Sequence, residues 1–198
     1  MVFGEYFASV LIGAQAGADW AWDRLYAGFA PSVLGYFRLR GAADPENLLG
    51  ETFFQLAKNI ERYSGDETAF RSYLFTIAHG CMVDERRSAF RRRVDVTADL
   101  AVLDSVDETD PAEEAVRADS TERILAVLSR LSADQRDVLL LRMVSGFSLE
   151  ETAQILSKSV GAVKALQSRG CASLRKTLDQ PVSSGPAPSV TSMRWVQT

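Results

Sequence analysis

The residues that could do chemistry in this sequence are cationic and aromatic rather than catalytic. His79 is the only histidine, and no carboxylate or cysteine accompanies it in a spacing typical of a metal site or a catalytic triad. Cys81 and Cys171 lie far apart and are not in zinc-ligand spacing. No glycine-rich phosphate loop, nucleophile motif or pair of catalytic carboxylates stands out. We therefore expect a protein that is not an enzyme and that uses no metal or cofactor.

The first cationic group ends a long helical segment in the front half of the chain. Five arginines occur within eight residues at this end, beside only one acid, Glu85, and an arginine lies among three aromatic residues near its start. Cations suit the phosphates of a duplex, and aromatic faces suit the bases of a melted strand. The alternatives are a solvated helix end and an ordinary bundle core. The residues concerned are Arg86, Arg87, Arg91, Arg92 and Arg93, and Phe70, Arg71, Tyr73 and Phe75.

The second cationic group belongs to a pattern of three helices over residues 132–178. Ser132 to Gln135 and Ser148 to Glu151 both match capping boxes, and Ser159 can cap a third, longer helix after a tight turn at residues 157–159. The helix beginning at Leu149 is short. This pattern predicts a helix-turn-helix whose last helix exposes cationic, polar and small residues to the major groove of DNA. The alternative is a capped helical hairpin with a solvated face.

The charge of the chain is segregated along its length. The 198 residues carry a net charge of −4, but residues 1–94 hold 11 basic and 11 acidic residues, and residues 123–180 hold 9 basic and 5 acidic ones. Between them, residues 95–122 hold 10 acids and one arginine. A low-aromatic, strongly acidic stretch of this kind indicates an extended linker rather than a folded domain.

Helical spacing of apolar residues dominates elsewhere, and no stretch alternates as a strand would. We predict helices near residues 22–40, 46–60 and 70–93, then from residue 121 to Leu178, and therefore an all-α protein of two small helical domains. The expected divisions are a front bundle at 1–94, a linker at 95–120, a back domain at 121–180 and a disordered tail at 181–198. No apolar run approaches the ~20 residues of a membrane helix. Two cysteines and no signal-peptide pattern fit a cytoplasmic protein that is not inserted in a membrane.

Several of these segments resemble the extracytoplasmic-function sigma factors of the sigma-70 family. Residues 131–142, 149–156 and 159–164 resemble the helices of sigma region four, and residues 168–175 match its basic end. Residues 17–26, 44–53 and 70–80 resemble the start of region two, its polymerase-binding signature and its promoter-melting helix. Asn47, Gly50, Tyr73, Gly80 and Ala162 depart from the family's usual residues at their positions. The resemblance covers about residues 5–180, in the family's order.

The resemblance implies a transcription initiation factor that binds core RNA polymerase and promoter DNA. Recognition of the minus-thirty-five element falls to Ser159, Ala162, Lys164, Ala165, Gln167, Ser168 and Arg169. Recognition of the minus-ten element and melting fall to Ser64, Asp66, Arg71, Tyr73, His79, Gly80, Arg86 and Arg87. Binding of the polymerase falls to Asp44, Glu46, Asn47, Leu48, Glu51 and Phe53.

The resemblance also implies an anti-sigma partner, which we expect on the apolar surface around Leu48, Leu49, Phe53 and Leu56. Two other functions remain open at the level of sequence. One is a helix-turn-helix regulator whose front bundle senses a ligand or dimerises. The other is an interaction protein whose helices bind only other proteins.

Overall fold

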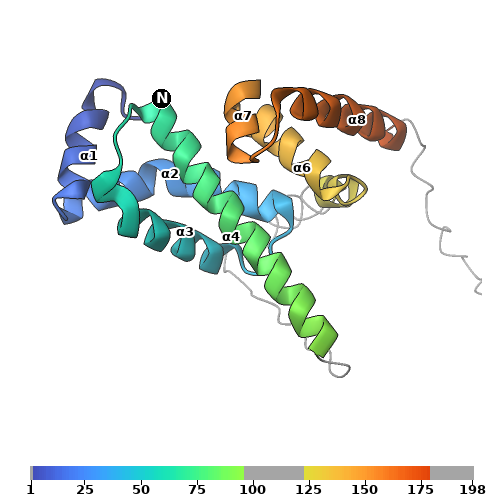
Figure 1. Cartoon of the computed structure of the whole chain (residues 1–198), viewed down its shortest axis with the longest axis horizontal. Coiled ribbons are helices and arrows are strands. Elements are labelled where there is room, and N and C mark those ends of the chain that lie inside the picture. Colours follow the sequence, from blue (N-terminus) through green and yellow to red (C-terminus); the bar gives the residue numbers. More distant parts are fainter. Residues whose placement is uncertain (1, 96–122, 179–198) are drawn as a thin grey trace, which may run out of the picture.

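The structure, a computed structural model, describes residues 2–95 and 123–178 (Figure 1). All regular elements in these two ranges are helices, which confirms the predicted all-α class. The acidic linker and the tail lie outside the described residues. The side chains of Arg91, Arg92 and Arg93 also lie outside the part of the chain whose side chains are described, so the expected arginine cluster reduces here to Arg86 and Arg87.

The front bundle consists of α1 (Phe7–Gln15), α2 (Asp19–Arg40), α3 (Pro45–Asn59) and α4 (Glu67–Asp95). Short 3-10 turns, Gly4–Tyr6 and Ile60–Arg62, precede α1 and follow α3. As predicted, α2 stops at Gly41, whose φ of 78° is left-handed and strains any residue but glycine. The core contains the fully buried side chains of Leu25, Phe29, Phe37, Leu56, Phe70, Leu74 and Phe75.

Two expectations for the front bundle need correction. Helical spacing predicts that Tyr26 shares one stripe of α2 with Trp22, Leu25, Phe29, Val33 and Phe37, but Tyr26 is 50% exposed and its ring lies 4.9 Å from that of Phe53. Phe70 and Phe75, considered for stacking on a melted strand, are fully buried and serve as core. Their burial follows from the packing of α4 against α2 and α3, which the spacing of residues on α4 alone does not reveal.

Helix α1 is an element that the sequence reading missed. It packs along α2 through Phe7, Val10, Leu11 and Ala14, all of which are buried. These positions follow the i, i+3, i+4, i+7 rule, so the signal was present in the sequence. The segment before α1 is tied to the start of α4, because the Glu67 carboxylate accepts hydrogen bonds from the backbone N–H groups of residues 2, 3 and 4.

The back domain begins with a helical stretch at 123–129 and continues with α6 (Ala133–Leu139), a π-helical turn η3 (Leu140–Val144), α7 (Leu149–Ile155) and α8 (Val160–Leu178). Both predicted capping boxes, at Ser132 and Ser148, are confirmed. Gly170 allows α8 to cross α6 closely, since a Cβ there would lie 2.9 Å from Leu139 Cδ1. Ile124, in the helical stretch before α6, is 50% exposed.

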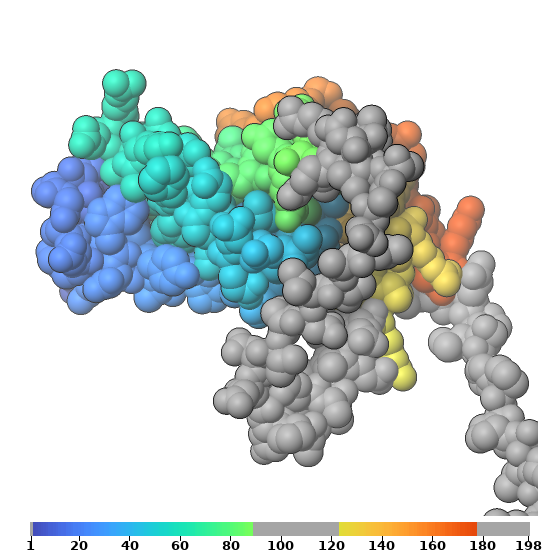
Figure 2. Space-filling view, turned by 90° about the horizontal axis from the view of Figure 1, so that it is seen from below, coloured from blue at the N-terminus to red at the C-terminus, as the bar shows by residue number. Residues whose placement is uncertain are grey.

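The front bundle and the back domain lie directly against each other (Figure 1). Helix α4 contacts α7, and α2 contacts η3. The buried apolar residues of both parts belong to the same core cluster, and the rings of Phe75 and Phe147 meet edge-on at 4.9 Å. In space-filling view, the orange surface of the back domain lies behind the green α4 (Figure 2).

Candidate nucleic-acid interface

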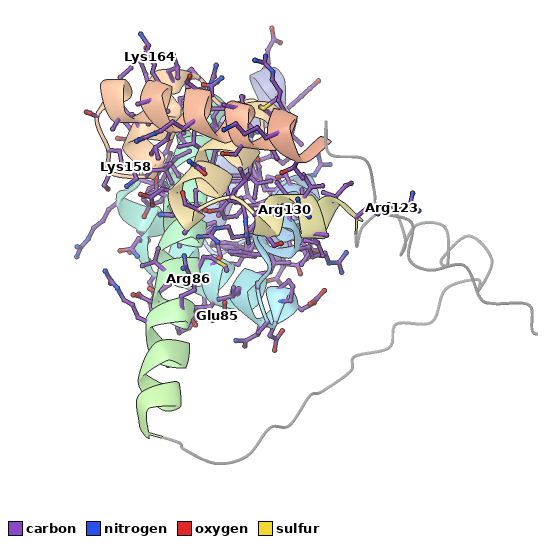
Figure 3. The ribbon with its side chains drawn as sticks, turned by 90° about the vertical axis from the view of Figure 1, so that its right-hand side faces the viewer. Glu85, Arg86, Arg123, Arg130, Lys158 and Lys164 are labelled. Atoms are coloured by element: carbon purple, nitrogen blue, oxygen red, sulfur yellow. The ribbon has the colours of Figure 1, made fainter. Side chains whose placement is uncertain are left out.

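Helix α8 presents a polar, cationic face to solvent. Lys164, Ala165, Ser168 and Arg169 are exposed, and Lys164 lies on the outer side of the helix, away from α4 (Figure 3). Ala162 is half-buried. Gln167, expected on the exposed face, is also half-buried, and its Oε1 accepts a hydrogen bond of 3.4 Å from Arg142 Nε. The helix thus brings most of the predicted minus-thirty-five residues together, with Gln167 partly withdrawn toward η3.

The orientation of α8 is set by the turn that precedes it. Ser159 Oγ accepts a hydrogen bond of 3.2 Å from Ala162 N, which confirms Ser159 as the cap. Before it, the Lys158 N–H donates to the Ala153 carbonyl and the Ser157 N–H to the Gln154 carbonyl, and Ser157 has a φ of 51°. These two bonds and the left-handed residue between them form a Schellman motif, which ends α7 and turns the chain into α8.

The start of α4 carries the first group of predicted minus-ten residues. Asp66 caps the helix, accepting a hydrogen bond of 2.8 Å from Ala69 N, while Ser64 is exposed in the preceding turn. Tyr73 stacks on Tyr63 with 5.1 Å between ring centres. Burial raises the pKa of Tyr63 to about 12. A cavity of about 430 Å³ opens beside these groups, lined by Asp66, Thr68, Ala69, Ser72, Tyr73, Thr76, Glu151 and Gln154.

Arg71 is half-buried and its guanidinium is engaged by the back domain. Its guanidinium donates to the backbone carbonyl of Ser145 and lies 4.1 Å from the ring centre of Phe147. Burial lowers its pKa, and the Glu151 carboxylate nearby opposes that shift. The next residue, Ser72, donates to Glu151 Oε1 at 3.2 Å. The α7 side of the back domain therefore covers the side chain that was expected to hold a melted strand.

His79 and Gly80 do not line the cavity beside Tyr73. His79 Nδ1 is 3.1 Å from Tyr36 Oη, and burial lowers the pKa of the imidazole, which favours its neutral form. Gly80 instead lines a groove of about 640 Å³ between α3 and α4. The structure thus does not bring the predicted minus-ten residues together at one site. Arg86 and Arg87 are exposed further along α4, with Arg87 paired to Asp84 at 3.3 Å.

The predicted polymerase-binding residues lie on α3. Asp44 caps this helix, accepting from Asn47 N at 2.9 Å, and Glu46 pairs with Arg38 at 2.7 Å. The groove between α3 and α4 is lined by Asn47, Leu48 and Glu51, together with Asp84 and Glu85. Leu48 is buried, so its contribution to that wall is small.

The predicted binding surface for an anti-sigma partner is wrong. Leu48, Leu49 and Leu56 are all buried, because they pack α3 against α2 and α4. The apolar surface of this region lies instead at Tyr26 and Phe54, 50% and 54% exposed, with half-buried Phe53 between the helices.

Two family models match the chain. Sigma-70 region 2 matches residues 25–92, and sigma-70 region 4 matches residues 121–174. The ECF RNA polymerase sigma factor SigD of Mycobacterium tuberculosis (strain ATCC 25618 / H37Rv) is 30% identical over 188 residues, which cover 92% of this chain and 87% of SigD. The chain belongs to the ECF sigma factors of the sigma-70 family. It is accordingly an alternative sigma factor that directs transcription initiation, and not an enzyme.

Other relatives agree with this assignment. The ECF sigma factor BldN of Streptomyces coelicolor is 32% identical over 167 residues, covering 83% of this chain and 63% of BldN, so the chain spans less than two thirds of that relative. A solved structure of CnrH in complex with the cytosolic domain of CnrY has a TM-score of 0.66 at 22% identity, covering 88% of this chain and 98% of CnrH. RpoE of Bartonella quintana, in complex with the anti-sigma factor NepR, has a TM-score of 0.54 at 21% identity, covering 89% and 96%. These two likenesses show the fold.

The contacts between the two parts of this sigma factor involve residues that the sequence reading did not single out. Arg40 and Asp137 form an ion pair whose side chains are only 5% and 4% exposed, and Tyr36 Oη donates to Asp137 at 3.3 Å. The partners lie 97 residues apart in the chain, and no local pattern in the sequence marks either of them. Within the described ranges, no helix is long and apolar enough to cross a membrane.

Proposed function

We propose that the sigma factor divides its work between α8 of the back domain and α3 and α4 of the front bundle. In this proposal α8 contacts the minus-thirty-five element, the start of α4 holds the melted minus-ten strand, and α3 binds core RNA polymerase. The observation that carries the proposal is the exposed face of α8, where Lys164, Ser168 and Arg169 stand free of the core on a helix capped by Ser159. A factor with these partners works in the cytoplasm.

The α8 assignment is tested by footprinting and run-off transcription with core polymerase. Lys164→Ala and Arg169→Ala should each weaken protection of the upstream element by about 1–3 kcal/mol if the side chain contacts a base or phosphate. Binding of core polymerase should stay unchanged. Lys176→Ala, a lysine on the same helix more than three turns further on, is the matched control. Equal protection in all four proteins would defeat the assignment.

We propose a second surface, on α2 and α3, for core polymerase and for an anti-sigma protein. A groove of about 400 Å³ runs along α2 beside α3, lined by Tyr26, Ala27, Ala30, Pro31, Leu34, Gly35, Arg38 and Leu49. Tyr26, which lines the groove, and Phe54, which is exposed elsewhere on α3, supply the apolar anchors that protein interfaces favour. The complexes of CnrH with CnrY and of RpoE with NepR support a protein partner of this class.

This second surface is tested by the affinity for core polymerase. Tyr26→Ser and Phe54→Ser should each reduce that affinity, by about tenfold or more if the ring is a buried anchor. Ile12→Ser is the control, because Ile12 is equally exposed but lies on α1. If Ile12→Ser weakens polymerase binding as much as Tyr26→Ser and Phe54→Ser do, the polymerase does not bind specifically at this surface.

A further inference from the structure

The turn between α3 and α4 is held in place by a side chain from α1. This turn, residues 63–66, follows the 3-10 helix Ile60–Arg62 and leads into α4. Gln15 Nε2, at the end of α1, donates hydrogen bonds of 3.0 Å to the Ile60 carbonyl and 2.8 Å to the Tyr63 carbonyl. An amide NH2 group has two hydrogens, so one side chain can satisfy both carbonyls. The two bonds fix the start of the α3–α4 turn relative to α1.

The other end of the α3–α4 turn is tied to the segment that precedes α1. Glu67, the first residue of α4, is 5% exposed, and its carboxylate accepts hydrogen bonds from the N–H groups of residues 2, 3 and 4, at 2.8 Å from Gly4 N. Hydrogen bonds to a charged acceptor are stronger than those between neutral groups. Residues 2–15, which we call the N-terminal brace, therefore bind the turn from both sides. Ser64 and Asp66 are exposed between the two attachments.

The turn also packs on an aromatic cluster that it shares with the brace. The ring of Phe70 lies 5.3 Å from that of Phe7 in the brace and 5.3 Å from that of Tyr63 in the turn. The backbone of the turn lies close against the Tyr63 side chain, since a Cβ at Gly65 would be only 2.5 Å from Tyr63 Oη. Close packing of this kind, together with the hydrogen bonds, favours a single conformation of the turn.

The brace lies ahead of the part of the chain that matches sigma-70 region 2, which begins at residue 25. Its attachments are turned inward, because Glu67 is buried and Gln15 is half-buried against the carbonyls that it binds. The exposed residues of the turn, Ser64 and Asp66, are the ones assigned above to the minus-ten element. Gln15 can therefore act on that element only through the position of the turn.

We propose that the N-terminal brace positions the α3–α4 turn for the melted minus-ten strand, with Gln15 as the positioning residue. The inference rests on the proposed function of the start of α4. Discrimination between bases needs recognition groups that already stand in place, because a protein whose competent state is only partly populated binds more weakly by that fraction. Contacts to phosphates carry no sequence information. A looser turn should therefore reduce the choice of base at the minus-ten element more than it reduces the overall binding of DNA.

The test is a selection of promoters from random-sequence DNA by core polymerase with the full-length sigma factor. Gln15→Leu keeps about the size of the side chain but removes both donors, and Gln15→Glu keeps its shape and also lacks the donors. Losing two hydrogen bonds should lower the competent fraction of the turn by on the order of tenfold. Enrichment of favoured over disfavoured bases should fall by a similar factor at the minus-ten element and stay unchanged at the minus-thirty-five element.

The matched control is Ser9→Ala, on the same helix. Ser9 is exposed, and its Oγ donates a hydrogen bond of 2.8 Å to the Tyr6 carbonyl, within the brace. This variant should keep the native preference at both elements. If the Gln15 variants lose both preferences equally, or bind core polymerase more weakly, Gln15 supports the fold in general and the proposal is wrong. An unchanged minus-ten preference in both Gln15 variants would also overturn it.

Hydrogen exchange in the free full-length protein measures the turn directly. The amide protons of residues 63–67 should exchange on the order of tenfold faster in Gln15→Leu and Gln15→Glu than in the native protein, with no change in α8. Ser9→Ala should exchange like the native protein. If exchange in the turn is the same in all four proteins, Gln15 does not hold the turn and the proposal fails.

A further variant separates this proposal from the assignment of the minus-ten contacts. Ser64→Ala/Asp66→Asn changes the exposed groups of the turn, while the asparagine keeps the helix cap of α4. If this double variant alters the minus-ten preference and the Gln15 variants do not, the assignment stands and the brace proposal fails. If neither the double variant nor the Gln15 variants alter that preference, the assignment of the turn to the minus-ten element is itself wrong, and the brace proposal fails with it.

Discussion

The two domains hold their proposed DNA-binding helices in different ways. Helix α8 is positioned by contacts within a few residues of one another: the boxes at Ser132 and Ser148, the left-handed Ser157 and the cap Ser159. Helix α4 has a local cap at Asp66, but its other contacts come from far away in the chain. Glu67 binds residues 2–4, and Arg71 binds Ser145.

This difference has a consequence for when each surface becomes available. The α8 face is exposed once the back domain has folded, because its supports are all inside that domain. The cations and aromatics of α4 depend on what packs against the front bundle. We therefore expect substitutions in the front bundle to act over long distances and substitutions in the back domain to act locally.

The largest expected effect comes from the aromatic core of the front bundle. Phe70 is fully buried against the rings of Phe7, Phe29 and Tyr63. Phe70→Ala should lower the free energy of unfolding by about 3–5 kcal/mol, because it leaves a cavity that the bundle cannot fill. Chemical denaturation measures this change, and Phe54→Ala, at an exposed position of α3, should stay within ~0.5 kcal/mol of the native value. A Phe70→Ala protein as stable as the native one would contradict the assignment of Phe70 to the core.

The next effect tests the long-range support at the start of α4. Glu67→Gln should cost about 1.5–3 kcal/mol of unfolding free energy, since hydrogen bonds to a charged acceptor are strong and this carboxylate is buried. The exposed Glu61→Gln serves as control. Hydrogen exchange should show faster exchange in residues 2–6 of Glu67→Gln and no change in α8. If amide protons of α8 also exchanged faster in Glu67→Gln, the effect of Glu67 would not be confined to the front bundle.

The same carboxylate predicts a dependence on pH. Burial alone would raise the pKa of Glu67, but hydrogen bonds from the N–H groups of Val2, Gly4 and Phe3 outweigh it and hold the pKa below its ordinary value. The stabilisation is therefore present above the unfolded pKa of about 4.3 and is lost as the pH falls through the lower, folded pKa. Unfolding measured from pH 7 to pH 3 should show a larger loss of stability in the native protein than in Glu67→Gln, whose remaining loss comes from other carboxylates with a lowered pKa, such as Glu46 and Glu151.

A smaller and local effect is expected from the capping box of α7. Ser148 Oγ accepts a hydrogen bond of 3.1 Å from Glu151 N, and Glu151 Oε2 accepts one of 2.7 Å from Ser148 N. Ser148→Ala should cost about 1 kcal/mol and speed amide exchange in α7 while leaving α1 unchanged. Ser129→Ala, outside both boxes, is the comparison. Faster exchange in α1 would mean that the back domain is not locally supported.

The smallest expected effect is a gain in stability. Ser157 occupies the left-handed position of the Schellman motif between α7 and α8, where glycine carries no steric penalty. Ser157→Gly should stabilise the back domain by about 0.5–1 kcal/mol, as measured by thermal unfolding. Ser168→Gly, within α8, should destabilise it by a similar amount because glycine is a poor helix former. If glycine lowered the stability at both positions, the left-handed conformation of Ser157 would not be strained.

The features that the sequence determined by itself are those carried by neighbouring residues. Helical periodicity identified α2, α3 and α4. The caps at Ser132 and Ser148 were identified from a serine followed, three residues later, by Gln or Glu, because the hydrogen bonds of a capping box lie within one turn. Helical periodicity could also have identified α1, from Phe7, Val10, Leu11 and Ala14. The exposed face of α8 was predicted in the same way, and the structure modified it at Ala162 and Gln167, which are half-buried.

Only the tertiary structure decided which of these surfaces are accessible. The spacing of Phe70, Phe75 and Leu48 is compatible with either core or surface, and packing between helices buries all three. The pairing of Arg40 with Asp137 and the cover over Arg71 join residues 74 to 97 positions apart. Each of these side chains, taken alone, reads as an ordinary polar residue on a helix. Their chemistry changes because burial removes water, and burial is a property of the assembled domains rather than of any local segment.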